Sequence, residues 1–124
     1  MTVQRLHVEK RFSEVAIAGN LVHLAGQLAA DTRVGIQQQT QQTLEIIDRL
    51  LADAGTDKHH ILSVMIFLKD ITQDYAAMNE VWDAWCADTQ APPRTCVEAK
   101  LYTTEVLVEM TVVAVKPEHP NSDN

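Results

Sequence analysis

Two charged residues in the second half of the chain could bind and process a small carboxylic acid. Arg94 follows two prolines, Pro92 and Pro93, and stands where a β-rich segment begins. Proline fixes φ and restricts the residue before it, so Arg94 is presented from a stiff backbone. A guanidinium held in this way can grip a carboxylate through two parallel hydrogen bonds.

Glu109 is the second candidate, because it is the lone carboxylate in an apolar run over residues 107–115. Alternation along a strand places it on one face with Thr111 and Val113. Burying a carboxylate costs free energy unless the group is paired or used. A fixed cation and a partly buried carboxylate indicate a binding site with a proton-handling group. By itself the local sequence favours a plainer interpretation, a structural ion pair or two unrelated solvated charges.

The composition narrows the class of protein. The chain has 124 residues, of which 46% are hydrophobic and 22% charged, as expected for one globular domain. Its net charge of -7 opposes binding to a polyanion, and Lys10-Arg11 is its only basic cluster, so we expect no nucleic-acid partner. No run approaches the length of a membrane span, and the N-terminus lacks the apolar core of a signal peptide. We therefore expect a cytoplasmic protein without a membrane partner.

The cysteines and histidines do not form a recognisable metal motif. Cys86 and Cys96 fit neither a CxxC pair nor a disulfide framework, and the histidines are scattered, so we expect no metal site. His59 and His60 are adjacent and would point in different directions, as a solvated pair does. Cys96 is near Arg94 and could be a reactive thiol, but a small buried apolar residue is the better interpretation.

Hydrophobic periodicity predicts the elements that must position these residues. A hairpin is expected around Gly19-Asn20, and Gly26 closes its second strand, either as a point of close approach or as an ordinary bend. One helix should end at Gly55, and a second should have Asp74 as its N-cap. The predicted strands are residues 5–8, 14–18, 21–25, 60–68, 94–101 and 107–115, and the predicted helices are residues 36–54 and 75–85.

This order of elements predicts the architecture. Strands linked by two helices favour one mixed sheet with both helices on one face. The other face would be apolar and uncovered, which indicates burial in a closed homo-oligomer. We assign residues 1–116 to a single domain and residues 117–124 to a flexible C-terminal tail.

A series of short segments, each weak alone, occurs in the order and spacing of one known family. They are Gly19-Asn20, Ala25-Gly26-Gln27, a helix over residues 40–55, residues 64–70, Met78-Asn79-Glu80, Pro93-Arg94-Thr95-Cys96-Val97-Glu98 and Val108-Glu109. On these residues the chain resembles the Rid family, also called YjgF or reactive-intermediate deaminases, over nearly its whole length. Residues 11–15 and 78–85 look closest to a YoaB-like branch.

The resemblance implies a structure and an activity. It implies a chorismate-mutase-like α+β fold, also called YjgF-like, and a homotrimer with a central β-barrel and clefts between subunits. Such proteins hydrolyse 2-imino acids, which PLP-dependent dehydratases release, to 2-keto acids and ammonia, with no metal or organic cofactor. By resemblance Arg94 binds the substrate carboxylate, the backbone of Cys96 helps to hold it, Glu109 orients water, and Gly26 allows close approach.

Two positions depart from the family pattern. Phe12 stands where many members have a cleft-lining tyrosine, and Ala25 stands where a serine commonly precedes the glycine. Both changes remove polar groups from the expected cleft, which would favour more apolar imino acids or weaken the activity. The alternative function is a non-catalytic trimer that binds 2-keto acids. RNA cleavage, attached to some relatives, fits poorly with the net charge.

Overall fold

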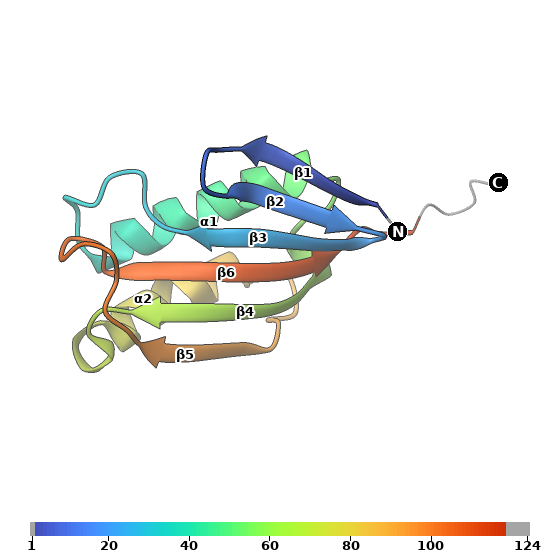
Figure 1. Ribbon diagram of the computed structural model, residues 1–124. Helices are drawn as coiled ribbons and strands as arrows, with labels where there is room; N and C mark the ends of the chain where they lie inside the picture. The colour runs from blue at the N-terminus through green and yellow to red at the C-terminus, as the bar shows by residue number, and fades with distance from the viewer. Residues whose placement is uncertain (1, 119–124) are drawn as a thin grey trace.

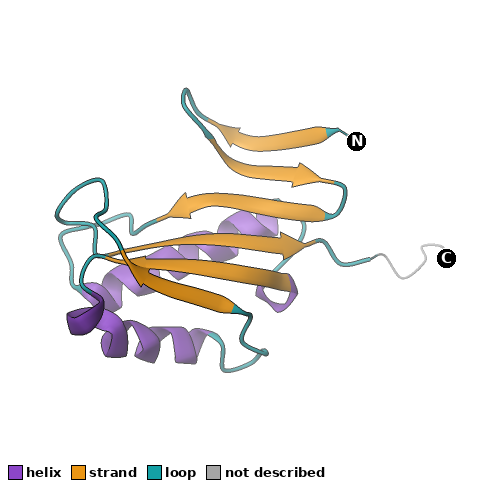
Figure 2. Cartoon of the chain, turned by 60° about the horizontal axis from the view of Figure 1, so that its bottom comes forward, coloured by secondary structure: helices purple, strands orange, loops and turns teal. Residues whose placement is uncertain are grey.

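The computed structural model describes residues 2–118, which form a six-stranded mixed sheet with two helices on one face (Figures 1 and 2). The strands are β1 (Val3–Val8), β2 (Ser13–Ala18), β3 (Leu21–Gln27), β4 (Ile61–Leu68), β5 (Arg94–Glu98) and β6 (Val108–Val115). Their order across the sheet is β1-β2-β3-β6-β4-β5, and β4 with β5 is the parallel pair among the described strands. The predicted sheet with both helices on one face is confirmed.

The helices α1 (Ile36–Asp53) and α2 (Ile71–Trp85) bury their apolar stripes against the sheet. A short 3₁₀ turn, Lys58–His60, leads into β4. Leu44 and Ile47 of α1, and Met78 and Trp82 of α2, are at most 4% exposed. Each side chain buried this completely contributes roughly 2–3 kcal/mol of hydrophobic stabilisation. Gly55 follows α1 with φ of +84°, which a glycine adopts without strain and which confirms it as the stop of the helix.

Several predicted boundaries were wrong. The N-cap of α2 is Asp70, whose side chain accepts a hydrogen bond from the Gln73 backbone N–H at 3.0 Å, whereas Asp74 is buried in the first turn. β5 ends at Glu98 rather than at residue 101, because the chain then leaves the sheet and crosses towards the start of β6. β1 starts at Val3, two residues before the predicted position.

The last strand lies in the middle of the sheet, between β3 and β4 (Figure 1). Its even-numbered residues, from Val108 to Ala114, face the helices and are buried, and its odd-numbered residues face the uncovered side. This alternation is the predicted one. No helix within residues 2–118 has the length and apolar character needed to cross a membrane. Most of the predicted tail, residues 119–124, lies outside the described residues.

Candidate functional site

Arg94 begins the edge strand β5, and its side chain lies against α2 on the helix-covered side of the sheet. The guanidinium Nη2 donates to Asn79 Oδ1 at 2.6 Å and to the Tyr75 hydroxyl at 3.3 Å. Its central carbon is 5.2 Å from the Trp82 ring centroid and 5.8 Å from that of Tyr75, both within cation–π range. Its position therefore depends on α2 as well as on the prolines before it.

The helical spacing of Tyr75, Met78 and Trp82 predicts core packing for all three. That is correct for Met78 and Trp82, which are buried, but Tyr75 is 43% exposed and holds the arginine. Asn79 was not identified as an arginine partner. Tyr75 and Asn79 are one helical turn apart and so share a face of α2. The spacing of these two polar residues indicated that they could bind one group together. It did not indicate that β5 is the strand that faces them.

Cys96 is two residues after Arg94 and faces the same side, where it packs against the core. Burial raises the pKa of its thiol, and the positive charge of Arg94 offsets this only in part. A thiol with a raised pKa is a poor nucleophile at neutral pH. Its side chain therefore serves packing, in line with the preferred interpretation of the sequence.

Glu109 lies on the opposite, uncovered face, where its strand pairs it with Phe67 of β4. The side chain is half-buried, and its carboxylate has no hydrogen-bond or ion-pair partner among residues 2–118. It folds over Gly26, where an added Cβ would overlap its Oε2 atom. The pairing of β3 with β6 is irregular between Leu24 and Gln27, next to this contact. Gly26 thus permits a close approach, and the approaching group is the carboxylate.

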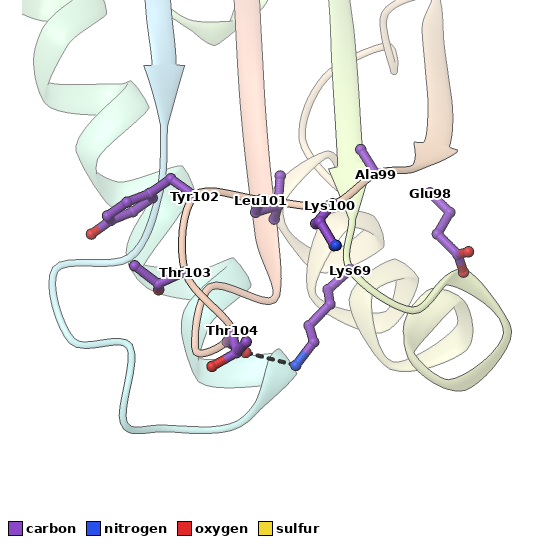
Figure 3. A pocket seen from close by; sticks show the side chains of 8 residues that line it. All are labelled: Lys69, Glu98, Ala99, Lys100, Leu101, Tyr102, Thr103 and Thr104. Carbon is purple, nitrogen blue, oxygen red and sulfur yellow. Dashed lines mark hydrogen bonds between the residues drawn. The ribbon is translucent and has the colours of Figure 1, made fainter.

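Two adjoining hollows lie where β4, β5 and β6 meet the segment that follows β5. The smaller, about 300 Å³, is lined by Glu109, Phe67 and residues 99–102. The larger, about 570 Å³, is lined by Lys69 and residues 98–104 (Figure 3). Residues 99–102 line both, so the free carboxylate of Glu109 faces a space with room for a small ligand.

The structure brings the predicted site residues into two groups rather than one. Arg94 and Cys96 project to the helix side, whereas Gly26 and Glu109 lie on the uncovered side. Arg94 pairs with Val64 of β4, three residues before the partner of Glu109. A single chain therefore does not place the guanidinium and the carboxylate around one ligand.

Phe12 lies in the turn before β2, with 53% of its surface exposed. It lines neither hollow next to Glu109. No group of three or more His, Cys, Asp or Glu that could hold a metal ion was found among residues 2–118.

The uncovered face carries partly exposed apolar side chains on three of its strands. Leu21 of β3, Met65 of β4 and Val97 of β5 are each 36–39% exposed. Exposed apolar side chains on a sheet face that no helix covers are typical of an interaction site. The predicted apolar face is present, and Glu109 lies on it.

Known proteins match this chain closely. A model of the family described as endoribonuclease L-PSP matches residues 2–116. A RutC family protein of Haemophilus ducreyi is 42% identical over 112 residues, 90% of this chain and 95% of that protein. The RutC family protein YoaB of Escherichia coli is 40% identical over 117 residues, 92% of this chain and 98% of that protein.

Solved structures agree with these matches. An uncharacterised protein from Pseudomonas aeruginosa has a TM-score of 0.89 and 45% identity, covering 94% of this chain and 100% of that one. A YjgF family member from Neisseria meningitidis has a TM-score of 0.90 and 40% identity, covering 96% and 98%. The resemblance read from the sequence segments is confirmed. The chain belongs to the endoribonuclease L-PSP family, also known as the YjgF/RutC/Rid family.

Proposed function

We propose that this protein hydrolyses reactive 2-imino acids to 2-keto acids and ammonia. The observation that carries the proposal is the carboxylate of Glu109, which has no polar partner within residues 2–118 and is held over Gly26 at a hollow of ligand size. A half-buried carboxylate without a partner is free to orient water and accept its proton. The YjgF/RutC/Rid family includes imine deaminases, which supports this assignment.

Arg94 is assigned to the carboxylate of the substrate. A guanidinium has five N–H donors, and the contacts with Asn79 and Tyr75 engage only Nη2. Nη1 also donates to the Met78 sulfur, a weak acceptor, at 3.9 Å, which leaves its second N–H and the Nε–H for a ligand. The arginine is thus ordered before the substrate arrives. Such preorganisation lowers the entropic cost of binding.

The site is proposed to form between copies of the chain. Arg94 and Glu109 of one chain project from opposite faces, but Arg94 is on an edge strand, where it can reach a neighbouring copy. The apolar face that carries Glu109 would be buried by such a neighbour. We propose a homotrimer in which Arg94 and Cys96 of one subunit meet Gly26, Glu109 and Phe12 of another.

The chemistry needs only water and one proton-handling group. Water adds to C2 of the protonated imine while Glu109 takes a proton from it, which gives a carbinolamine. Glu109 then passes this proton to the amino nitrogen. The C2–N bond breaks, ammonia leaves, and Glu109 takes the hydroxyl proton as the carbonyl forms. Glu109 then releases this proton to ammonia or to solvent, which restores its carboxylate. The imines would come from PLP-dependent dehydratases, and we expect the reaction in the cytoplasm.

The decisive experiment measures whether the protein speeds the decay of an imine beyond its rate in buffer alone. 2-Iminobutanoate is generated in situ with an amino-acid oxidase and trapped with semicarbazide, with and without the protein. We expect less imine to be trapped when the protein is present. If imine decay stays at the buffer rate while 2-ketobutyrate still binds, the protein is a non-catalytic keto-acid binder and the proposal is wrong.

The interface can be tested by mixing two inactive variants. Arg94→Ala and Glu109→Gln subunits are unfolded, mixed in equal amounts and refolded, and each variant is also refolded alone as a control. In a closed ring, random mixing leaves about a quarter of the interfaces with both native residues, so activity should return to about that fraction. Lack of recovery in a mixture shown to contain hybrid trimers would contradict the shared site, as would a monomeric mass at micromolar concentration by light scattering.

RNA cleavage is not proposed, although the matching family model is described as an endoribonuclease. Affinity for RNA depends on neutralising phosphates with Lys and Arg. The chain has ten of these residues against seventeen acidic ones, for a net charge of -7. The resulting field repels RNA.

A further inference from the structure

The larger hollow beside Glu109 contains two lysines. Lys69 and Lys100 both line this space of about 570 Å³, and Figure 3 shows the two side chains on the same side of the crossing segment. The Lys69 ammonium donates to the Thr104 carbonyl at 2.7 Å, which holds it in place and leaves two N–H donors. Thr103 and Thr104 add hydroxyl groups to the same wall.

Neither lysine forms an ion pair with another residue in the described part of the chain. The one carboxylate that lines the hollow, Glu98, is bound to the Ile71 backbone N–H at 3.0 Å and points away from the lysines (Figure 3). The chain has seventeen acidic residues, yet none of those within residues 2–118 forms an ion pair with these two ammonium groups. Two like charges next to one hollow attract an anion.

Lys100 connects this hollow to the proposed reaction site. It lines the smaller hollow together with Glu109 and Phe67, and the larger one together with Lys69. A ligand whose C2 atom lies at Glu109 can therefore extend its side chain past Lys100. A four-carbon monocarboxylic acid would leave the larger hollow unfilled.

We propose that the hollow lined by Lys69 and Lys100 binds the distal carboxylate of 2-imino dicarboxylic acids. This inference rests on the proposed function, of which it names the substrate class. It contrasts with the apolar preference expected from Phe12 and Ala25, and one set of measurements separates the two. Because Lys69 and Lys100 are both exposed, their charge contribution is modest and weakens as ionic strength rises.

The test compares two stable keto acids and then the two matching imines. Calorimetry measures binding of 2-oxoglutarate and 2-ketobutyrate to the wild type, to Lys100→Gln and to Lys10→Gln. Lys10→Gln is the matched control, because it removes the same charge from an exposed site outside both hollows. Hydrolysis of 2-iminoglutarate and 2-iminobutanoate, each made by an oxidase, is measured on the same proteins.

We expect the wild type to bind 2-oxoglutarate more tightly than 2-ketobutyrate. Lys100→Gln should raise the Kd of 2-oxoglutarate by about fivefold and change that of 2-ketobutyrate little. Lys10→Gln should alter neither. Equal binding of both ligands to the wild type would overturn the inference, as would an equal loss of both in Lys100→Gln. Inorganic phosphate is the third probe. Lys100-dependent phosphate binding without a preference for 2-oxoglutarate would show a free-anion site and also overturn it.

The inference and the proposed function can fail separately. If 2-iminobutanoate is hydrolysed but dicarboxylates are not preferred, the deaminase stands and the distal-carboxylate site falls. If no imine is hydrolysed but 2-oxoglutarate binds with the expected dependence on Lys100, the binding site stands and the deaminase falls.

Discussion

Arg94 and Glu109 are supported in contrasting ways. The guanidinium is tied to Asn79 and Tyr75 and lies within cation–π range of two rings. The carboxylate has no polar partner among the described residues and rests over a glycine. A side chain that is already ordered binds a ligand more tightly, because binding then costs less conformational entropy. A group that must exchange protons gains from an uncommitted lone pair. The following predictions test this difference, starting with the largest effect.

Replacing the fixed group should remove binding and activity together. Arg94→Ala is expected to lower kcat/KM by about 10³-fold, because a ligand carboxylate loses its charged partner. Arg94→Lys should rescue little, since an ammonium cannot form the fork. Kinetics and keto-acid calorimetry measure this, with Arg33→Ala as the control, because the Arg33 side chain is 88% exposed. If Arg94→Ala still bound keto acids, Arg94 would not be the group that holds the ligand.

Replacing the uncommitted group should affect only the chemical step. Glu109→Gln keeps the shape of the side chain but cannot accept a proton, so kcat should fall by about 10²-fold or more. The Kd of 2-ketobutyrate should change little. Glu105→Gln is the matched control, being an exposed glutamate shortly before the same strand. A fall in binding equal to the fall in kcat would show that Glu109 holds the ligand instead.

Moving the carboxylate without removing it gives a sharper test. A methyl group at position 26 would occupy the space of Glu109 Oε2, so Gly26→Ala should displace the carboxylate. Misplacement of a catalytic group by about 1 Å can cost about 10²-fold in rate. The melting temperature should change little, because the group displaced is the end of a long side chain. Gly35→Ala is the control, since a Cβ there meets no atom within 4 Å.

Loosening the support of Arg94 should have a smaller effect. Tyr75→Phe removes one hydrogen bond to Nη2 but keeps the ring, so keto-acid binding should weaken by about threefold. Tyr75→Leu also removes the ring and should weaken binding further. Calorimetry of the two variants separates the hydroxyl from the ring. Identical affinities in the wild type and Tyr75→Leu would mean that α2 does not position the arginine.

The helix that supports Arg94 also contains a buried acid whose effect on stability depends on pH. Burial raises the pKa of Asp74 above its ordinary 3.8, and Asp70 adds to this while Lys69 offsets part of it. The folded state then binds the proton more tightly than the unfolded state, so stability falls as pH rises through this window. Asp74→Asn should be more stable than wild type at pH 7.

The gain from Asp74→Asn should shrink as the pH approaches 3.8 and should be absent below it. Urea unfolding across this range measures the difference at a fixed protein concentration. A difference that does not vary with pH would contradict the assignment to a buried carboxylate.

Local patterns predicted most of the fold but little of the support around the site. Apolar residues recur at helical spacing along α1 and alternate along β6, so both elements can be predicted without tertiary information. Asp70 and Asp74 are both residue types that favour an N-cap. In the structure Asp70 is the N-cap, and Asp74 is buried within the first turn of the helix. Arg94 and Glu109 were found from their types and neighbours. That they project from opposite faces required the register of three strands.

The contacts that the sequence did not reveal join distant segments. Tyr75 meets Arg94 because β4, α2 and β5 form a parallel crossover, which spacing alone cannot align. Glu109 meets Gly26 because β3 pairs with β6 through an irregular register. Residue types indicated that each of these positions mattered, whereas their partners depended on tertiary pairing.

The central position of the last strand has a consequence for how the chain acquires its chemistry. β3 and β4 are not neighbours, and the sheet is continuous only when β6 enters between them. Pairings between segments this distant form late, because the loops they close are long. Glu109 is on that strand, so a chain still leaving the ribosome has Arg94 before the proposed catalytic carboxylate is in place. Completion of the sheet therefore comes before any assembly of the proposed shared site.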